Sequence, residues 1–260
     1  MIHPPGGSRL PELDRHLSRR DALSTLEIIH ASLDCEDSLG LCRLVQQVAG
    51  LIDAEFGSCL ISSRDMETGD SRMVIVDAGF PPGWLEHYSE RQFQLIDPII
   101  SENFTNYGLQ YWTDTYRKQP PPQRFLDEAA EAGLGTGFSY GLQDDTGTGG
   151  SLFSFGGPKL PRIARTAAIL EMVLPHLHRV LNQLNMAEPW RVLPPPLSPR
   201  ELEVLKWTGV GKSSWETGMI LHISERTVNF HIRNIMLKLD AVNRPQAVAT
   251  ALKLGLLQLP

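Results

Sequence analysis

The 260-residue sequence has no long apolar run and only three cysteines. No stretch approaches the roughly 18 consecutive apolar residues that span a membrane, and the first 20 residues lack the apolar segment of a signal peptide. Cys35, Cys42 and Cys59 are odd in number and show no CxxC spacing, which argues against a disulfide framework and against a zinc site. We therefore expect a cytoplasmic protein with no metal, no cofactor and no membrane partner.

The charge is divided unevenly along the chain. Residues 193–260 carry eight Lys or Arg and five Asp or Glu, a net charge of +3. The whole chain has a net charge of -6, so the remaining residues carry -9. A basic segment joined to an acidic one is the pattern expected if only the C-terminal part binds a nucleic acid.

A proline-rich segment, AEPWRVLPPPLSPRE at 187–201, marks the clearest domain boundary, because consecutive prolines favour an extended connection. We predict four parts on this basis. They are a flexible N-terminal segment at 1–19, a first domain at 20–186, a linker at 187–197 and a second domain at 198–260.

The first domain has an α+β pattern. Apolar residues at helical spacing predict two helices within 20–53 and one over 163–186, kinked at Pro175. The stretch 84–133 reads as partly helical. Four short β-rich segments bounded by glycine or polar turns predict strands at 58–62, 73–78, 137–142 and 151–155. Together these elements predict an α/β/α sandwich around an antiparallel sheet.

The apolar stripe of the predicted 163–186 helix is compatible with two roles, contact with a second subunit or packing in the internal core.

The second domain is predicted to be all helical, with four short helices. Ser198 and Glu201 form a capping box that begins the first helix, and Ser224 caps the third. The second helix, near 214–221, is joined to the third by the short turn His-Ile-Ser, and a fourth runs over about 244–254. This arrangement describes a helix-turn-helix DNA-binding unit.

The third helix of this unit presents a polar face opposite its buried stripe. Arginine suits guanine and asparagine suits adenine, while groups at a helix N-terminus suit phosphates. The same face is also compatible with an ordinary solvated surface. The residues predicted to contact DNA are Ser224 and Thr227 for the backbone, Arg226 and Asn229 for bases, and Arg233 and Lys238 further along.

A resemblance favours DNA contact over a merely solvated surface. Residues 197–239 are similar, nearly position for position, to the DNA-binding domain of LuxR-type regulators. Glu201, Leu205 and Gly211 stand where that family has its characteristic Glu, Leu and Gly. Thr217-Gly218 departs from the commoner Ile-Ala, and we expect this glycine to loosen the second helix by under about 1 kcal/mol.

The first domain lacks the five-fold βα repeat of a phosphorylated receiver. Instead Trp84, Tyr88, Asp97-Pro98, Trp112 and Gly137 resemble, in order and spacing, the acyl-homoserine-lactone-binding domain of quorum-sensing LuxR-type receptors. The resemblance implies that Trp84 donates to the lactone carbonyl and that Asp97 accepts from the ligand amide. It also implies that Ser154 bonds the amide carbonyl and that Tyr88 and Trp112 pack on the acyl chain and lactone ring.

Two departures leave an alternative open. Phe80 stands where many relatives have a ligand-bonding tyrosine, and Gly141 stands where proline is frequent. Taken singly, the aromatic residues also suit a plain core and Asp97 a helix cap. The alternative function is a LuxR-type regulator that has lost lactone sensing or responds to a different small molecule. A lactone-hydrolysing enzyme finds little support, since His176 and His178 have no HxxDH or GxSxG partner.

The predicted protein is therefore a ligand-responsive, DNA-binding transcriptional regulator and not an enzyme. Its partners are predicted to be an N-acyl-homoserine lactone, a second copy of the chain, and double-stranded promoter DNA with an inverted repeat whose half-sites lie about one helical turn apart. RNA polymerase is a further candidate partner.

Overall fold

The computed structural model describes residues 16–64, 71–145, 147, 149–160, 162–184, 191–193, 197–254 and 256–257. Most of the predicted N-terminal segment and much of the predicted linker lie outside these residues. A six-stranded sheet in the order β3-β4-β5-β1-β2-β6 forms the centre of the first domain, and every neighbouring pair is antiparallel. The strands are β1 (Phe56–Arg64), β2 (Ser71–Asp77), β3 (Leu109–Tyr111), β4 (Thr136–Gln143), β5 (Gly150–Gly157) and β6 (Arg191–Leu193).

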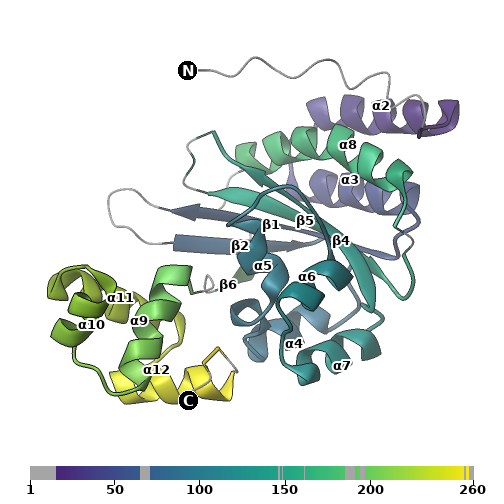
Figure 1. Ribbon diagram of the computed structural model, residues 1–260. Coiled ribbons are helices and arrows are strands. Elements are labelled where there is room, and N and C mark those ends of the chain that lie inside the picture. Colours follow the sequence, from purple (N-terminus) through teal and green to yellow (C-terminus); the bar gives the residue numbers. More distant parts are fainter. Residues whose placement is uncertain are drawn as a thin grey trace.

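Helices cover both faces of this sheet (Figure 1). One face carries α2 (Arg19–Leu33), α3 (Ser38–Leu51) and α8 (Ala164–Gln183). The other carries α4 (Trp84–Glu90), the 3-10 helix η1 (Phe93–Leu95), α5 (Pro98–Asn103), α6 (Trp112–Lys118) and α7 (Gln123–Glu131). The predicted α/β/α sandwich and its four strands are confirmed. The two strands that the sequence did not indicate, β3 and β6, have only three residues each, too few for an alternating pattern.

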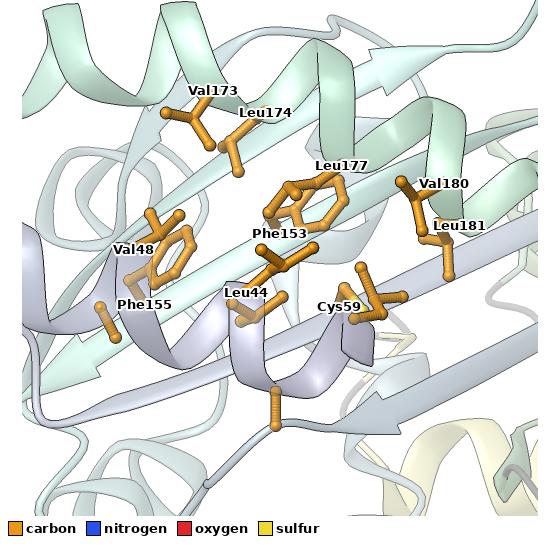
Figure 2. Packing of buried hydrophobic residues seen from close by; sticks show 14 of the residues in the cluster. Leu44, Val48, Cys59, Phe153, Phe155, Val173, Leu174, Leu177, Val180 and Leu181 are labelled. Atoms are coloured by element: carbon orange, nitrogen blue, oxygen red, sulfur yellow. The ribbon is translucent and has the colours of Figure 1, made fainter. Parts of the chain in front are cut away.

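Alternation along the central strands separates two cores. On β1, Cys59 and Ile61 face α3 and α8, whereas Ser58 and Leu60 face the helices on the opposite side. The first core is closely packed, with Phe153 of β5 fully buried against apolar side chains of α3 and α8 (Figure 2). The second core, on the α4–α7 side, contains the cavity described below.

The stripe of α8 is internal core. Leu170, Leu174, Leu177 and Leu181 are fully buried within the chain, so this stripe has no free surface for a second subunit. Of the two roles that the sequence left open for this helix, the structure therefore selects core packing. The helix continues through Pro175, and this residue lies on the exposed side of the helix.

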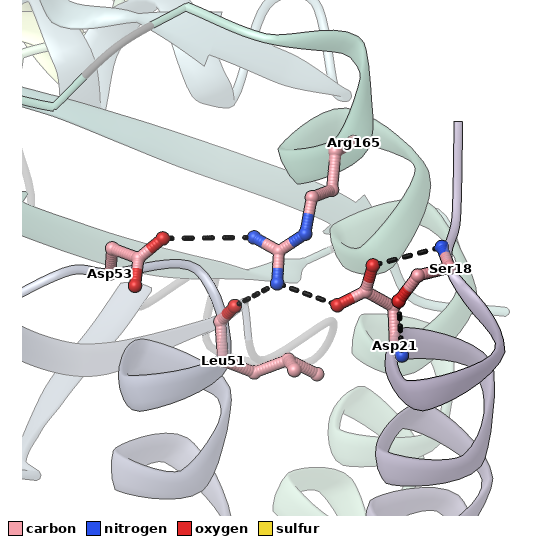
Figure 3. Close-up of polar contacts among 5 residues, drawn as sticks. All are labelled: Ser18, Asp21, Leu51, Asp53 and Arg165. Carbon is pink, nitrogen blue, oxygen red and sulfur yellow. Dashed lines mark hydrogen bonds and ion pairs between the residues drawn. The ribbon is translucent and has the colours of Figure 1, made fainter.

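Helix α2 turns polar side chains inward. Asp21, Thr25 and Ser32 are buried, and an ion pair explains the first of them. Arg165 of α8 donates to the Asp21 carboxylate over 2.7 Å and to the Leu51 carbonyl over 2.9 Å, which joins α8, α2 and α3 (Figure 3). This guanidinium holds the pKa of Asp21 well below its usual range.

The outward face of α2 carries three exposed leucines among charged and polar side chains. Leu23, Leu26 and Leu33 are 51%, 56% and 58% exposed. At 100° per residue they lie opposite the buried face of the helix. Apolar side chains grouped on one exposed stripe are a feature of contact surfaces rather than of an isolated monomer.

The second domain consists of α9 (Pro199–Gly209), α10 (Ser214–Leu221), α11 (Glu225–Lys238) and α12 (Arg244–Lys253). The predicted capping box is present, since Ser198 accepts from the Glu201 amide and Glu201 accepts from the Ser198 amide. Part of the expected linker is ordered as β6, which pairs with β2. The predicted four-helix unit is confirmed.

The turn between α10 and α11 explains Gly218. His222 ends α10 in the left-handed region, with φ of 55°, and the Ile223 amide donates back to the Gly218 carbonyl. A Cβ atom at Gly218 would lie 2.7 Å from the Ile223 carbonyl oxygen, so the glycine permits a close approach. Glycine in place of the commoner alanine therefore allows this close packing, in addition to any effect on helix propensity.

The two domains are in hydrophobic contact at η1 and the residue that follows it, Ile96. Leu95, which is 5% exposed, belongs to the same buried cluster as Leu205, Val228 and Leu239 of the helix-turn-helix unit. Two residues earlier, Phe93 belongs to the core on the α4–α7 side of the sheet. A single three-residue helix thus contributes to both cores.

Candidate functional site: a cavity beside the sheet and a helix-turn-helix face

A cavity of about 60 Å³ lies between the sheet and helices α4–α7. Its walls combine side chains from β1, β2 and β5 with side chains from four helices. The predicted ligand residues Phe80, Trp84, Tyr88, Asp97, Trp112 and Ser154 all line it, together with Ser58, Leu60, Ile75, Leu85, Ile99, Ile100, Tyr116, Phe125, Ala129, Leu134 and Leu152. The structure therefore brings together every residue that was predicted to contact the ligand.

Asp97 supplies the one carboxylate of this cavity wall. One oxygen accepts from the Tyr88 hydroxyl over 2.9 Å, and the other accepts from the Ile99 amide over 2.9 Å as the N-cap of α5. Burial raises the pKa of Asp97 to about 6, although both hydrogen bonds favour the charged form. Asp97 therefore caps α5, as one interpretation of the sequence expected, and also lines the cavity, while its contact with a ligand stays a prediction.

Trp84 begins α4 and faces the same cavity. Gly83 precedes it in the left-handed region, with φ of 77°, which turns the chain into the helix at this point. The indole is 6% exposed and lies about 6 Å, ring centre to ring centre, from both Tyr88 and Phe93. This aromatic packing holds the indole ring beside Tyr88, the hydroxyl partner of Asp97.

Trp112 has a more specific role than packing. Its indole N–H donates to the Ser139 hydroxyl over 2.9 Å, and the Ser139 and Ser154 oxygens are 2.8 Å apart. Gly137 and Gly156 make room for the ring, because a Cβ atom at either position would lie under 3 Å from indole carbons. The glycine that formed part of the family resemblance thus has a physical reason.

The sequence analysis did not indicate Ser58 and Ser139 as residues near the cavity. Ser58 is directly opposite Ser154 across the β1–β5 pair, and Ser139 is directly opposite Ser154 across the β4–β5 pair. The three hydroxyls therefore form a row on the cavity side of the sheet. Alternation on β1 was available in the sequence as a signal, but strand register is a tertiary property.

The second departure from the family pattern, Gly141, has a structural explanation that does not involve the cavity. A Cβ atom there would lie 1.6 Å from the side-chain oxygen of Asn103. Asn103 is fully buried, and its amide nitrogen donates to the Ser151 carbonyl over 3.4 Å. The glycine and the asparagine accommodate each other. Gly141 therefore says nothing about ligand recognition, and Phe80 is left as the departure that lines the cavity.

The histidines considered for hydrolysis lie on the opposite side of the sheet. His178 Nδ1 is 2.8 Å from the hydroxyl of Ser151, and Nε2 is 2.9 Å from the Asn182 amide nitrogen. Ser151 is also fully buried.

The predicted DNA-contacting residues lie on or before α11. Ser224 caps this helix and accepts from the Thr227 amide over 3.0 Å, while Arg226 and Arg233 are exposed. Asn229 is also exposed, and its oxygen accepts from Ser214 and from Arg244. These bonds orient its amide from α10 and α12.

Lys238 is held within the domain. Its ammonium donates to Glu201 over 2.8 Å, and the lysine and glutamate side chains are only 16% and 4% exposed. Removing either partner would leave a buried charge uncompensated. The structure thus shows a stabilising role for Lys238 in addition to the DNA contact that we predict for it.

Two family models match the chain. The one described as "Autoinducer binding domain" matches residues 39–181, and the one described as "Bacterial regulatory proteins, luxR family" matches residues 195–251. Among the described residues, each helix is too short or too polar to cross a membrane.

Characterised relatives extend over most of the chain. It is 36% identical over 184 residues to the HTH-type quorum sensing-dependent transcriptional regulator RpaR of Rhodopseudomonas palustris, covering 70% of this chain and 74% of RpaR. It is 34% identical over 239 residues to the transcriptional activator SolR of Ralstonia solanacearum, covering 88% and 96% of the two chains. Both relatives are regulators of transcription.

Solved structures share the fold. The structure of SdiA in complex with octanoyl-rac-glycerol has a TM-score of 0.51 at 22% identity and covers 92% of this chain and 96% of SdiA. The N-acylhomoserine lactone dependent factor CepR2 of Burkholderia cenocepacia has a TM-score of 0.50 at 17% identity, covering 62% and 93%. With a cavity between sheet and helices in one domain and a helix-turn-helix in the other, the chain belongs to the LuxR family of quorum-sensing transcriptional regulators.

Proposed function

We propose that the cavity binds an N-acyl-homoserine lactone and that the occupied protein binds promoter DNA as a dimer. The convergence of Trp84, Asp97 and Ser154 on one apolar cavity carries the proposal. An indole N–H can only donate, a carboxylate can only accept, and a hydroxyl can do both. These groups match the lactone carbonyl, the amide N–H and the amide carbonyl of such a ligand, and the apolar wall matches its acyl chain.

Titration of the purified chain with a series of acyl-homoserine lactones tests the ligand. We expect micromolar or tighter binding of at least one member and a loss of roughly 5- to 15-fold for Trp84→Phe, which keeps the ring packing but removes the donor. Trp207→Phe in the helix-turn-helix domain is the matched control and should bind normally. Failure of every lactone to bind would exclude this ligand class.

An acyl glycerol is the competing ligand class, since SdiA is described in complex with octanoyl-rac-glycerol. Phe80, which brings no hydroxyl to the cavity, is the observation in its favour. Such a ligand has no amide N–H, but its two free hydroxyls can donate to Asp97. Saturable binding of 1-octanoyl-glycerol, without binding of any lactone, would support this second class.

DNA binding is assigned to the exposed face of α11. Ser224 and Thr227 at its N-terminus are proposed to contact phosphates, and Arg226, Asn229 and Arg233 are proposed to enter the major groove, with Lys238 at the end of the helix. A dimer places two such helices against an inverted repeat.

The leucine face of α2 is our candidate for the dimer contact, because it is the apolar stripe that α2 leaves exposed in the sensor domain. We expect the double substitution Leu23→Asp and Leu26→Asp to convert a dimer to a monomer while leaving the fold intact, since both side chains are more than half exposed. Analytical ultracentrifugation with saturating lactone measures this. Val242→Asp, at a residue 83% exposed in the other domain, is the control. A double variant that stays dimeric would move the contact elsewhere.

A further inference from the structure

Two serines on the cavity side of the sheet, Ser139 and Ser154, are joined to the Trp112 indole by hydrogen bonds. Ser139 is fully buried and accepts from the Trp112 indole, so its own proton needs another acceptor. Among the described residues, the Ser154 oxygen at 2.8 Å is the partner in place. The Ser154 proton is thereby left to point to the cavity, where it can be donated to a ligand oxygen.

Ser58 adds a second hydroxyl to the same wall. It is 3% exposed, lines the cavity, and stands directly opposite Ser154 on the neighbouring strand. Its surroundings on this face are apolar, with Leu60 and Leu152 beside the two serines. A hydroxyl in such an apolar wall is stabilised by a ligand oxygen that accepts its proton.

The separation of the two serines limits what Ser58 can reach. Directly opposite residues of an antiparallel pair have Cβ atoms about 4.5–5.5 Å apart. If Ser154 donates to the amide carbonyl on carbon 1 of the acyl group, Ser58 faces the ligand's acyl chain slightly beyond carbon 1. An oxygen on carbon 3 is the acyl substituent that would meet it.

We infer that Ser58 is a specificity-determining residue that donates to an oxygen on carbon 3 of the acyl chain, so that the site favours 3-oxo-acyl over unsubstituted acyl homoserine lactones. This inference rests on the proposed function and deepens it by naming the ligand subclass. Phe80 has no hydroxyl, so the sheet supplies the polar contacts to this part of the ligand.

The test compares matched ligands on matched variants. Lactones with acyl chains of four to twelve carbons, each with and without the 3-oxo group, are titrated calorimetrically against the native chain. We expect a preference for the oxo member of each pair that binds. Ser58→Ala should weaken binding of the oxo member by roughly 5- to 15-fold and change the unsubstituted member less than about twofold.

Two further variants separate the possible results. Ser154→Ala should weaken both members of a pair equally, because both contain the amide carbonyl. Ser62→Ala, on the same face of β1 but outside the cavity wall, should change neither.

Equal loss for both ligands in Ser58→Ala would show that Ser58 shares the amide carbonyl, and no loss would show that it faces no ligand oxygen. Either result overturns the inference while leaving lactone binding intact. Absence of any lactone binding by the native chain would overturn the proposed function and this inference with it.

Discussion

Asp97→Asn is expected to stabilise the ligand-free protein while weakening lactone binding about 10- to 100-fold. The carboxylate is ionised at neutral pH inside a cavity wall, where its pKa of about 6 exceeds the ordinary value of 3.8. That difference corresponds to roughly 3 kcal/mol of destabilisation at pH 7.5, which the neutral amide removes. Asparagine also remains a good N-cap for α5. Binding weakens because a charge-assisted hydrogen bond to the ligand amide is lost.

The pH dependence follows from the direction of the shift. The folded chain takes up a proton at Asp97 more readily than the unfolded chain does, so this group destabilises the fold above pH 6 and progressively less as the pH falls to about 4. The stability advantage of Asp97→Asn should therefore be largest at pH 7.5 and vanish near pH 4. Lactone affinity of the native chain should fall below pH 6, whereas that of the variant should stay flat.

Chemical denaturation and calorimetric titration at several pH values measure both effects. Asp127→Asn, at an exposed position on α7, is the matched control and should change neither quantity. A variant that is less stable than the native chain at pH 7.5 would contradict a buried, ionised Asp97. A variant with native affinity would contradict its contact with the ligand.

Leu95→Ala is expected to release the helix-turn-helix domain from the sensor domain. Leu95 lies in the buried cluster of the second domain although it belongs to η1 of the first. Truncating a buried leucine costs about 2–5 kcal/mol. Hydrogen exchange measured by mass spectrometry should therefore accelerate in α9–α12, with little change in α8.

Leu177→Ala is the matched control, because Leu177 is fully buried in the core between α8 and the sheet. Its exchange pattern should be the reverse, with acceleration in α8 and none in the second domain. Unchanged exchange in α9–α12 of Leu95→Ala would show that the two domains do not share this contact in solution. Because Phe93, two residues away, packs beside Trp84 of the cavity wall, the same contact is a direct physical connection between the cavity and the helix-turn-helix domain.

The second domain was almost fully predictable from the sequence, because its signals are local. Capping by Ser198 and Ser224 and the period of Val228, Ile232 and Ile235 depend on residues within one or two turns of helix. The engagement of Lys238 by Glu201 was not predictable, since the two residues are 37 positions apart. Only the packing of α9 against α11 brings them together.

The residues predicted to contact a ligand were chosen by their resemblance to a family, and the structure shows that they share one cavity wall. Helical spacing predicted a helix at α2 but did not show which face is buried, and the structure places Asp21 inward in an ion pair with Arg165. Periodicity shows that a helix has two faces and does not show which of them a partner element covers.

The sequence by itself determined the two-domain order, the type of each long element and the family, because these depend on local periodicity, capping and residue identity. The tertiary structure alone decided which hydroxyls line the cavity beside Asp97, which face of α2 is exposed and that Leu95 joins the two domains. Those features arise from strand register and from contacts between distant segments, and the free energy that selects them comes from packing and paired charges rather than from local propensity.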